Sequence, residues 1–239
     1  MNNINLIKNK IAVLDFDETL IRGQSQKLLL DYFYKQKIIG LTRYLIVLLW
    51  FFLYKLNVLK EIKPIIEYAV SGIEGFDAIE LKGLFDDFFL TVCRPRIYDN
   101  SMNLVSFLKA KGFHVLLIST AIEPIICRAK EYMMIDDIIC TRLEANQDKY
   151  SGRIVGDPVY GIFKVVALKN YLNEKNYSIQ NSIAFADHYS DVRLLETVAW
   201  PVAVNPSTKL LKYAQTKKWS VLYLNNNESF QHFKSNTKF

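Results

Sequence analysis

The chain has 239 residues, of which 51% are hydrophobic and 23% are charged, and its formal net charge is +6. This composition excludes a disordered chain and allows either one large domain or a core with a smaller inserted domain. The basic residues are scattered rather than clustered, so the positive charge does not predict a nucleic-acid partner.

The three cysteines, Cys93, Cys127 and Cys140, are odd in number and form no C-x-x-C pair. This pattern indicates free thiols in a reducing compartment rather than disulfides or a zinc site. Residues 1–10 are polar and lack the apolar stretch of a signal peptide. We therefore expect a cytoplasmic protein.

Residues 11–14 form an uninterrupted apolar run that leads directly into Asp15 and Asp17. Such a run is typical of a strand buried on both faces in the centre of a parallel sheet. Ligands bind beyond the carboxyl ends of such strands. Burying two carboxylates there is costly unless a cation or hydrogen bonds compensate. Taken alone, the pair fits either a metal or phosphate site or a solvated acidic turn.

The pattern then becomes helical, with helices expected over residues 24–37, 41–56, 59–70 and 77–90. The second of these contains the uncharged run 44–54. That run is too short to cross a bilayer, which needs roughly 20 residues. Because a helix that is apolar all round must be buried, we expect this one, from Leu41 to Leu56, to pack inside a helical domain or a dimer interface. A membrane-surface helix or an apolar substrate pocket is the alternative.

From residue 95 onward strands and helices alternate, which predicts an α/β fold with a parallel sheet covered by helices on both faces. The expected strands are 113–118, 138–141, 183–186, 201–204 and 221–224. The expected helices are 100–110, 123–133, 162–172, 192–197 and 208–214. We also expect an irregular hairpin over residues 150–156 and a loose polar tail over residues 225–239.

Parallel strands end at one edge of a sheet, so polar residues that follow different strands converge there. Carboxylates gathered at that edge repel one another and require a cation, and hard oxygen ligands in this number favour Mg²⁺. Besides Asp15 and Asp17, the polar residues placed at this edge are Ser119, Lys164, Asp187 and Asp191.

These motifs, in this order, resemble those of the haloacid dehalogenase superfamily, and specifically its phosphoserine-phosphatase-like branch (subfamily IB). The first motif runs from Asp15 through Asp17 to Thr19. The resemblance covers nearly the whole chain. It implies a three-layer, Rossmann-like catalytic core formed by residues 1–21 and 95–239, with an inserted helical cap over residues 22–94.

The resemblance also implies roles for the motif residues. Asp15 would be the nucleophile that forms an aspartyl-phosphate, and Asp17 the general acid and then base. Ser119 would donate a hydrogen bond to the phosphoryl group, whose charge Lys164 would neutralise. Mg²⁺ would be held by Asp15, the backbone carbonyl of Asp17 and Asp187, with Asp191 as a further ligand or as support. Candidate substrate contacts are Glu18, Thr19, Arg22, Thr120 and His188.

The expected function is therefore a Mg²⁺-dependent phosphatase for a small phosphomonoester. Phosphoserine, phosphoethanolamine, phosphocholine and lipid phosphates are all candidates, because substrate choice depends on the cap. A phosphotransferase that uses the same aspartyl-phosphate is the first alternative. The second is a membrane-surface or protein-binding module whose working part is the helix over residues 41–56, and a homodimer is a further option.

Overall fold

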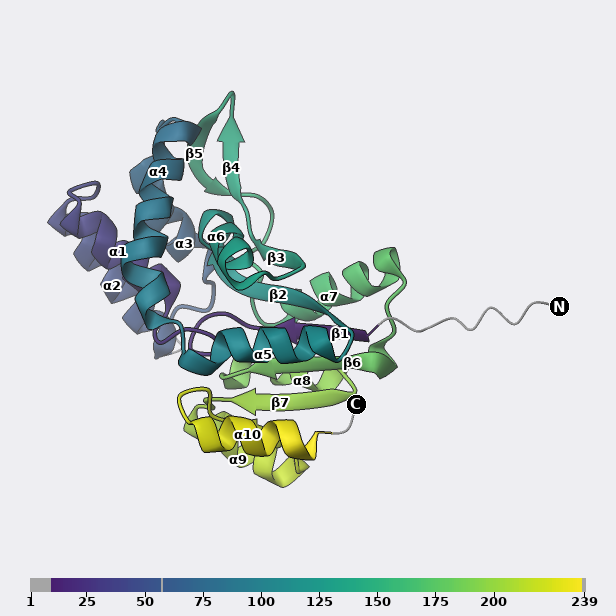
Figure 1. The fold of residues 1–239 in the computed structure, drawn as a ribbon. Coiled ribbons are helices and arrows are strands. Elements are labelled where there is room, and N and C mark those ends of the chain that lie inside the picture. Colours follow the sequence, from purple (N-terminus) through teal and green to yellow (C-terminus); the bar gives the residue numbers. More distant parts are fainter. Residues whose placement is uncertain (1–9, 57, 238–239) are drawn as a thin grey trace.

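The computed structural model describes residues 10–56 and 58–237, and its centre is a six-stranded, entirely parallel sheet (Figure 1). The order of the strands across the sheet is β3-β2-β1-β6-β7-β8. The strands are β1 (Lys10–Leu14), β2 (Phe113–Ile122), β3 (Asp137–Thr141), β6 (Ser182–Ala186), β7 (Trp200–Val204) and β8 (Ser220–Leu222). The predicted parallel α/β sheet is confirmed.

Strand β1 lies in the middle of the sheet, hydrogen-bonded to β2 on one side and to β6 on the other. Its apolar residues 11–14 are completely buried. Ile11 and Val13 pack on one face of the sheet, and Ala12 and Leu14 on the other. An apolar residue is needed at every position because both faces of this strand are covered by other elements.

Helices cover both faces and so complete the three layers. One face carries α5 (Asp99–Ala110), α6 (Glu123–Met133) and α10 (Asn227–Asn236). The other face carries α7 (Ile162–Lys175), α8 (Val192–Thr197) and α9 (Thr208–Lys217).

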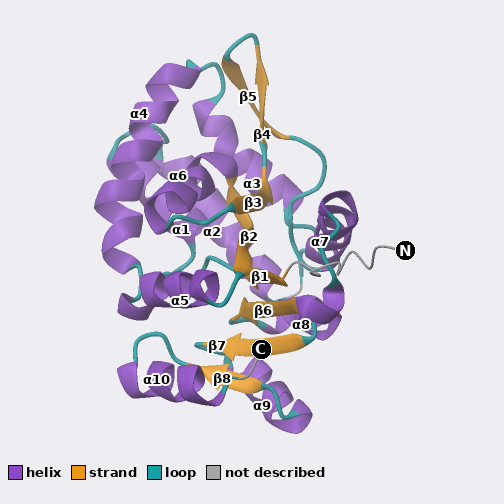
Figure 2. Cartoon of the chain, turned by 45° about the vertical axis from the view of Figure 1, so that its right-hand side comes forward, coloured by secondary structure: helices purple, strands orange, loops and turns teal. Residues whose placement is uncertain are grey.

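Between β1 and α5 the chain forms a group of helices that lies beside the sheet (Figure 2), and we call this group the insertion. Its helices are α1 (Ser25–Lys35), α2 (Leu41–Lys55), α3 (Lys63–Val70) and α4 (Ala78–Phe88). Asp77 caps α4 by accepting a hydrogen bond from the backbone N–H of Ile79 at 2.7 Å. The sequence predicted that this helix would end at residue 90. Instead, helical structure continues after α4 through a π-helical turn (Phe89–Cys93) and a 3₁₀ turn (Arg94–Arg96).

The expectation that α2 would be buried is correct for only one of its sides. Val47 is completely buried, whereas Leu45 and Leu49 are 53% and 54% exposed. The neighbouring helices α1 and α3 cover one side of α2 and leave the other open. Among the described residues, no helix is both long enough and apolar enough to cross a membrane.

The hairpin is irregular, as predicted, because its pairing register shifts between Leu143 and Ala145, but it begins earlier than predicted. Strands β4 (Leu143–Asn146) and β5 (Lys149–Ile154) pair antiparallel around a turn at Gln147 and Asp148, both of which have positive φ. Gly152, with φ of +75°, lies against the insertion, where an added Cβ would come within 3.0 Å of the Cα of Ser71. The hairpin therefore packs on the insertion through a backbone approach that only glycine permits.

The predicted loose tail was wrong, because residues 227–236 form helix α10. Asn226 caps this helix by accepting a hydrogen bond from the N–H of Ser229 at 3.0 Å. Phe230 and Phe233 are buried, and the ring of Phe233 contacts that of Phe185 on β6 at 6.0 Å between centroids. Two aromatic side chains at helical spacing outweigh the polar composition of the segment. Residues 238–239 of the predicted tail, and residues 1–9, on which the signal-peptide prediction depends, lie outside the described residues.

Candidate active site

The loop after β1 is held tightly against the end of the sheet. The backbone N–H of Asp15 donates to the carbonyl of Phe185 at 3.0 Å. The N–H groups of Leu20 and Ile21 both donate to the carbonyl of Phe16, at 2.9 and 3.2 Å. Thr19 is completely buried, and its hydroxyl donates to Asp187 at 3.3 Å. Thr19 therefore connects the first and fourth motifs from inside the protein.

Asn205, directly after β7, supports the same loop, although it was not among the residues selected from the sequence. Its side-chain amide donates to the carbonyls of Glu18 and Thr19, at 3.3 and 3.2 Å. Its amide oxygen accepts from the N–H of Leu224 at 3.0 Å. A polar residue just after a strand was the available signal, but its partners are far away in sequence.

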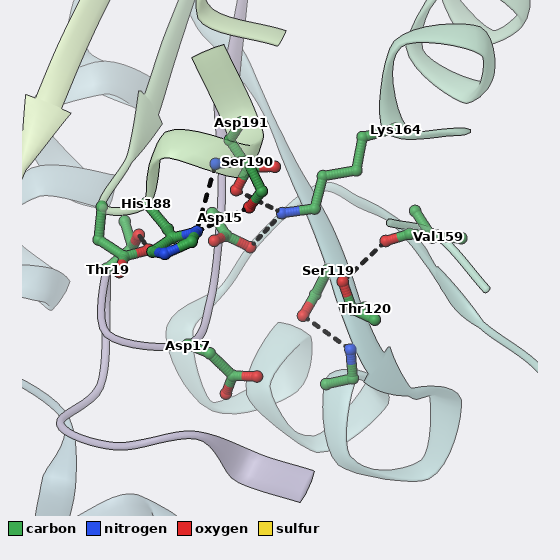
Figure 3. Close-up of polar contacts among 12 residues, drawn as sticks. Asp15, Asp17, Thr19, Ser119, Thr120, Val159, Lys164, His188, Ser190 and Asp191 are labelled. Carbon is green, nitrogen blue, oxygen red and sulfur yellow. Dashed lines mark hydrogen bonds and ion pairs between the residues drawn. The ribbon is translucent and has the colours of Figure 1, made fainter. Parts of the chain in front are cut away.

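Lys164, in the first turn of α7, lies between two carboxylates at the centre of the site (Figure 3). Its ammonium is 2.9 Å from an oxygen of Asp15 and 2.9 Å from an oxygen of Asp191. All three residues are buried, and Lys164 is only 2% exposed. Burial alone would lower the pKa of Lys164, but the two carboxylates outweigh it and raise that pKa. The lysine thus stays charged and compensates the nearby acids.

The negative charge of the carboxylates at this centre exceeds the positive charge of Lys164. Burial, together with the charge of neighbouring acids, raises the pKa of Asp15 to about 7 and that of Asp187 to about 8, while Lys164 opposes both shifts. One buried oxygen of Asp191 has no hydrogen-bond partner among the described residues. These features fit a divalent cation. Such an ion would lower the pKa of Asp15 and Asp187 and would give the free oxygen of Asp191 a partner.

The described side chains do not by themselves form a ready metal cluster, since no group of three or more His, Cys, Asp or Glu residues is gathered among them. The ion pairs made by Lys164 occupy one oxygen each of Asp15 and Asp191. The side chain of Asp17 lies apart from the Asp15–Lys164 pair (Figure 3). Asp15, Asp187 and Asp191 are thus the side chains at this centre that could hold a cation.

Asp17 has its own set of partners. Its two oxygens accept hydrogen bonds from Ser25, one from the backbone N–H at 2.8 Å and one from the hydroxyl at 3.0 Å. Burial raises the pKa of Asp17 to about 6, and the two bonds from Ser25 limit the rise. Ser25, completely buried in the first turn of α1, was not selected from the sequence. Its position eight residues beyond Asp17 gave no sign of this contact.

Ser119 and Thr120 lie on β2, which continues four residues beyond the predicted end at residue 118 and reaches Ile122. The oxygen of the Ser119 hydroxyl accepts a hydrogen bond from the N–H of Ala121 at 3.1 Å. That bond orients the hydroxyl so that its own hydrogen can be donated to a ligand. The Thr120 hydroxyl donates to the carbonyl of Val159 at 2.9 Å, so Thr120 joins β2 to the segment before α7.

A cavity of about 500 Å³ is lined by the acids, Ser119 and Lys164. Some of the predicted substrate contacts also line this cavity, and others do not. Glu18, Thr120 and His188 line the cavity. The Nδ1 atom of His188 accepts from the N–H of Ser190 at 3.2 Å. Arg22 is exposed, is not among the lining residues and lies over the ring of Tyr98 at 5.5 Å. The structure thus does not bring Arg22 to the site.

The insertion supplies the opposite wall of the cavity with a mixture of polar and apolar side chains. Tyr54 on α2 meets Tyr160 of the core edge to face, with 6.2 Å between ring centroids. Gln26 donates from its amide to the carbonyl of Thr120 at 3.1 Å. The lining residues that were not selected from the sequence are Gln24, Gln26, Phe51, Tyr54, Ile62, Tyr160, Tyr189, Ser190 and Lys209.

Comparison with known proteins is consistent with this geometry. The family model of haloacid dehalogenase-like hydrolases matches residues 12–196. A histidinol-phosphatase from Neisseria meningitidis is 28% identical over 216 residues, which cover 89% of this chain and 97% of the relative. A phosphoserine phosphatase from Mycobacterium tuberculosis is 24% identical over 153 residues, which cover 64% of this chain and only 50% of that relative.

Among solved structures, a protein of unknown function from Bordetella pertussis superposes with a TM-score of 0.83 at 24% identity, covering 91% of this chain and 99% of that one. This likeness shows that the two chains share a fold. The family match covers most of the chain and includes every motif that forms the buried Asp15–Lys164–Asp191 centre. The chain therefore belongs to the haloacid dehalogenase-like hydrolases.

Proposed function

We propose that this haloacid dehalogenase-family phosphatase hydrolyses a small phosphomonoester with Mg²⁺ and through an aspartyl-phosphate on Asp15. The observation that carries the proposal is the different surroundings of two acids that are one residue apart. Asp15 is paired with the buried ammonium of Lys164 at 2.9 Å, whereas both oxygens of Asp17 are held by Ser25. The first arrangement suits a nucleophile and the second a proton carrier.

In the first step a carboxylate oxygen of Asp15 attacks phosphorus, and the bond from phosphorus to the ester oxygen breaks. Asp17, whose pKa is raised to about 6, gives its proton to the leaving alcohol oxygen. Ser119 donates a hydrogen bond to a phosphoryl oxygen, and Lys164 offsets the negative charge. Asp17 then accepts a proton from the water that attacks phosphorus, which releases phosphate and restores Asp15.

Asp15, Asp187 and the backbone carbonyl of Asp17 would hold the Mg²⁺, with Asp191 in support. The ion would supply charge that lets carboxylates and a phosphate dianion share one buried site. The excess of buried carboxylate over lysine charge, and the unpartnered oxygen of Asp191, support this assignment.

The helical insertion would act as a cap that excludes water from the site and selects the alcohol part of the substrate. Gln24 and Gln26 offer amide groups in the cavity, and Phe51 and Tyr54 offer apolar surface. Two of the relatives are named for small phosphorylated substrates, histidinol phosphate and phosphoserine. We therefore place the substrate among phosphomonoesters of small alcohols that combine polar and apolar groups.

The test is phosphate release by the purified protein from a panel of phosphomonoesters, with Mg²⁺ and with EDTA. We expect turnover that depends on Mg²⁺. Asp15→Asn should reduce it by at least about 10⁴-fold, because the covalent intermediate cannot form without the carboxylate nucleophile. Asp157→Asn is the matched control. It changes an exposed acid outside the insertion and should retain turnover.

Phosphate-labelled substrate should also leave hydroxylamine-sensitive label on the wild-type protein after an acid quench, and none on Asp15→Asn. Turnover that persists in EDTA would exclude the metal, and turnover by Asp15→Asn would exclude the nucleophile. Adding an alcohol acceptor separates hydrolysis from phosphotransfer, because transfer yields a new ester in place of free phosphate.

A further inference from the structure

Helix α2 carries a row of apolar side chains that face solvent. We call this row the α2 stripe: Leu41, Leu45, Leu49, Phe52 and Leu56, each between 53% and 57% exposed. Their spacing of three and four residues places them on one side of the helix. Single exposed apolar residues are ordinary on a protein surface, but a contiguous row marks an interaction site.

The opposite side of α2 is already occupied. Val47 is completely buried, and Trp50 contacts Tyr68 of α3 with 5.0 Å between ring centroids. Phe51 and Tyr54 line the cavity above the buried acids. Packing among the described residues thus accounts for one side of α2 and leaves more than half of each stripe side chain exposed.

The sequence around α2 is rich in basic residues, and an acid that contacts α2 is Asp31 of α1, which accepts a hydrogen bond from Tyr44 at 2.9 Å. No acidic residue occurs in the sequence between Asp31 and Glu61. Lys35 and Lys37, just before α2, and Lys60, just after it, are exposed. The basic residues of this acid-free stretch are Lys35, Lys37, Arg43, Lys55 and Lys60. An apolar row with cations beyond both of its ends is complementary to a surface that is apolar inside and anionic outside.

A second copy of the chain fits the stripe less well. A two-fold contact places the same patch on both partners, so it would bring two basic stretches of like charge together. One helix of 15 residues also offers little area. A stripe of that length presents on the order of a few hundred Å², below the ~800 Å² per partner of a stable interface.

We propose that the α2 stripe docks this enzyme on the surface of a lipid bilayer that carries anionic headgroups. The apolar side chains would enter the boundary between headgroups and acyl chains, about 5–10 Å deep, with α2 lying in the plane of the surface. The flanking lysines would meet anionic headgroups and strengthen the attachment by electrostatic attraction. Because α2 also forms part of the cavity wall, docking brings the active-site cavity close to the membrane.

The test is co-sedimentation of the full-length protein with vesicles. We expect binding to vesicles of phosphatidylglycerol mixed with phosphatidylcholine, weaker binding to phosphatidylcholine alone, and loss of binding as salt is raised. The double variant Leu45→Asp/Leu49→Asp should weaken binding by at least about ten-fold, because it places charge where apolar contact is needed. Lys35→Glu/Lys37→Glu should weaken binding to the anionic vesicles only.

The matched control is Ile79→Asp on α4, which changes an apolar residue that is 83% exposed but lies outside the stripe. It should bind like the wild type. Melting temperatures verify that each variant is folded, and Asp15→Asn should bind normally, so failure of docking is separable from failure of catalysis. A protein that stays in the supernatant, or a stripe variant that binds as the wild type does, overturns the proposal. A dimer in light scattering that the stripe variant converts to monomer would assign the stripe to a second copy instead.

Discussion

Proteins usually expose charged side chains and bury apolar ones. The sheet edge and helix α2 each depart from this distribution, in different ways. The sheet edge buries charge, and its buried lysine finds two carboxylates within 2.9 Å. Helix α2 exposes apolar side chains, and the described residues leave more than half of each stripe side chain uncovered. Buried charge must be compensated inside the fold, because leaving it unpaired costs several kcal/mol. Exposing apolar surface costs the folded chain far less free energy, so such a surface can remain exposed until an external partner binds it.

The largest effect should follow from breaking the compensation at the sheet edge. Lys164→Met leaves Asp15 and Asp191 buried without a cation, so we expect a loss of about 3 kcal/mol or more in the free energy of unfolding and loss of turnover. The loss of stability should shrink as the pH falls, because a protonated carboxyl needs no cation. Denaturant unfolding of this variant and of Lys169→Met, an exposed lysine on the same helix, measures the difference. Equal stability of the two variants would contradict the compensation.

A second prediction concerns the proton carried by Asp17. Because its pKa is raised to about 6, Asp17 loses the proton it must donate as the pH rises through about 6, and kcat/KM should fall there. Ser25→Ala removes one of the two hydrogen bonds that favour the charged form, so the fall should move to higher pH by about one unit. Asp17→Asn should abolish this limb of the profile and cost about 10²–10⁴-fold in rate. An unchanged profile in Ser25→Ala would separate Ser25 from the proton transfer.

The smallest effect should distinguish the two sides of α2. Val47→Ala removes a completely buried side chain and should cost about 2 kcal/mol of stability. Leu49→Ala, two residues further along and 54% exposed, should change stability by less than about 0.5 kcal/mol. Thermal unfolding of both variants makes the comparison within one helix. A large loss in Leu49→Ala would mean that the stripe already packs against something.

The gathering of polar residues at the sheet edge was predictable because their positions depend on strand ends. Asp15, Ser119 and Asp187 each follow or close a central apolar run, and parallel strands bring such positions together. Ser25 and Asn205 were not predictable in this way. Each makes its contacts through the path of a loop, and neither stands in a pattern of residue types that indicates a partner.

The sequence alone determined the fold class, the order of strands and helices along the core and which polar residues meet at the edge of the sheet. These depend on local apolar patterns and on the rule that parallel strands end together, both of which can be read without coordinates. Tertiary structure alone decided that residues 227–236 are a helix, that Arg22 lies away from the cavity and that one side of α2 is open. Burial is decided by neighbours that are distant in sequence, and an apolar run looks the same in the sequence whether or not something covers it.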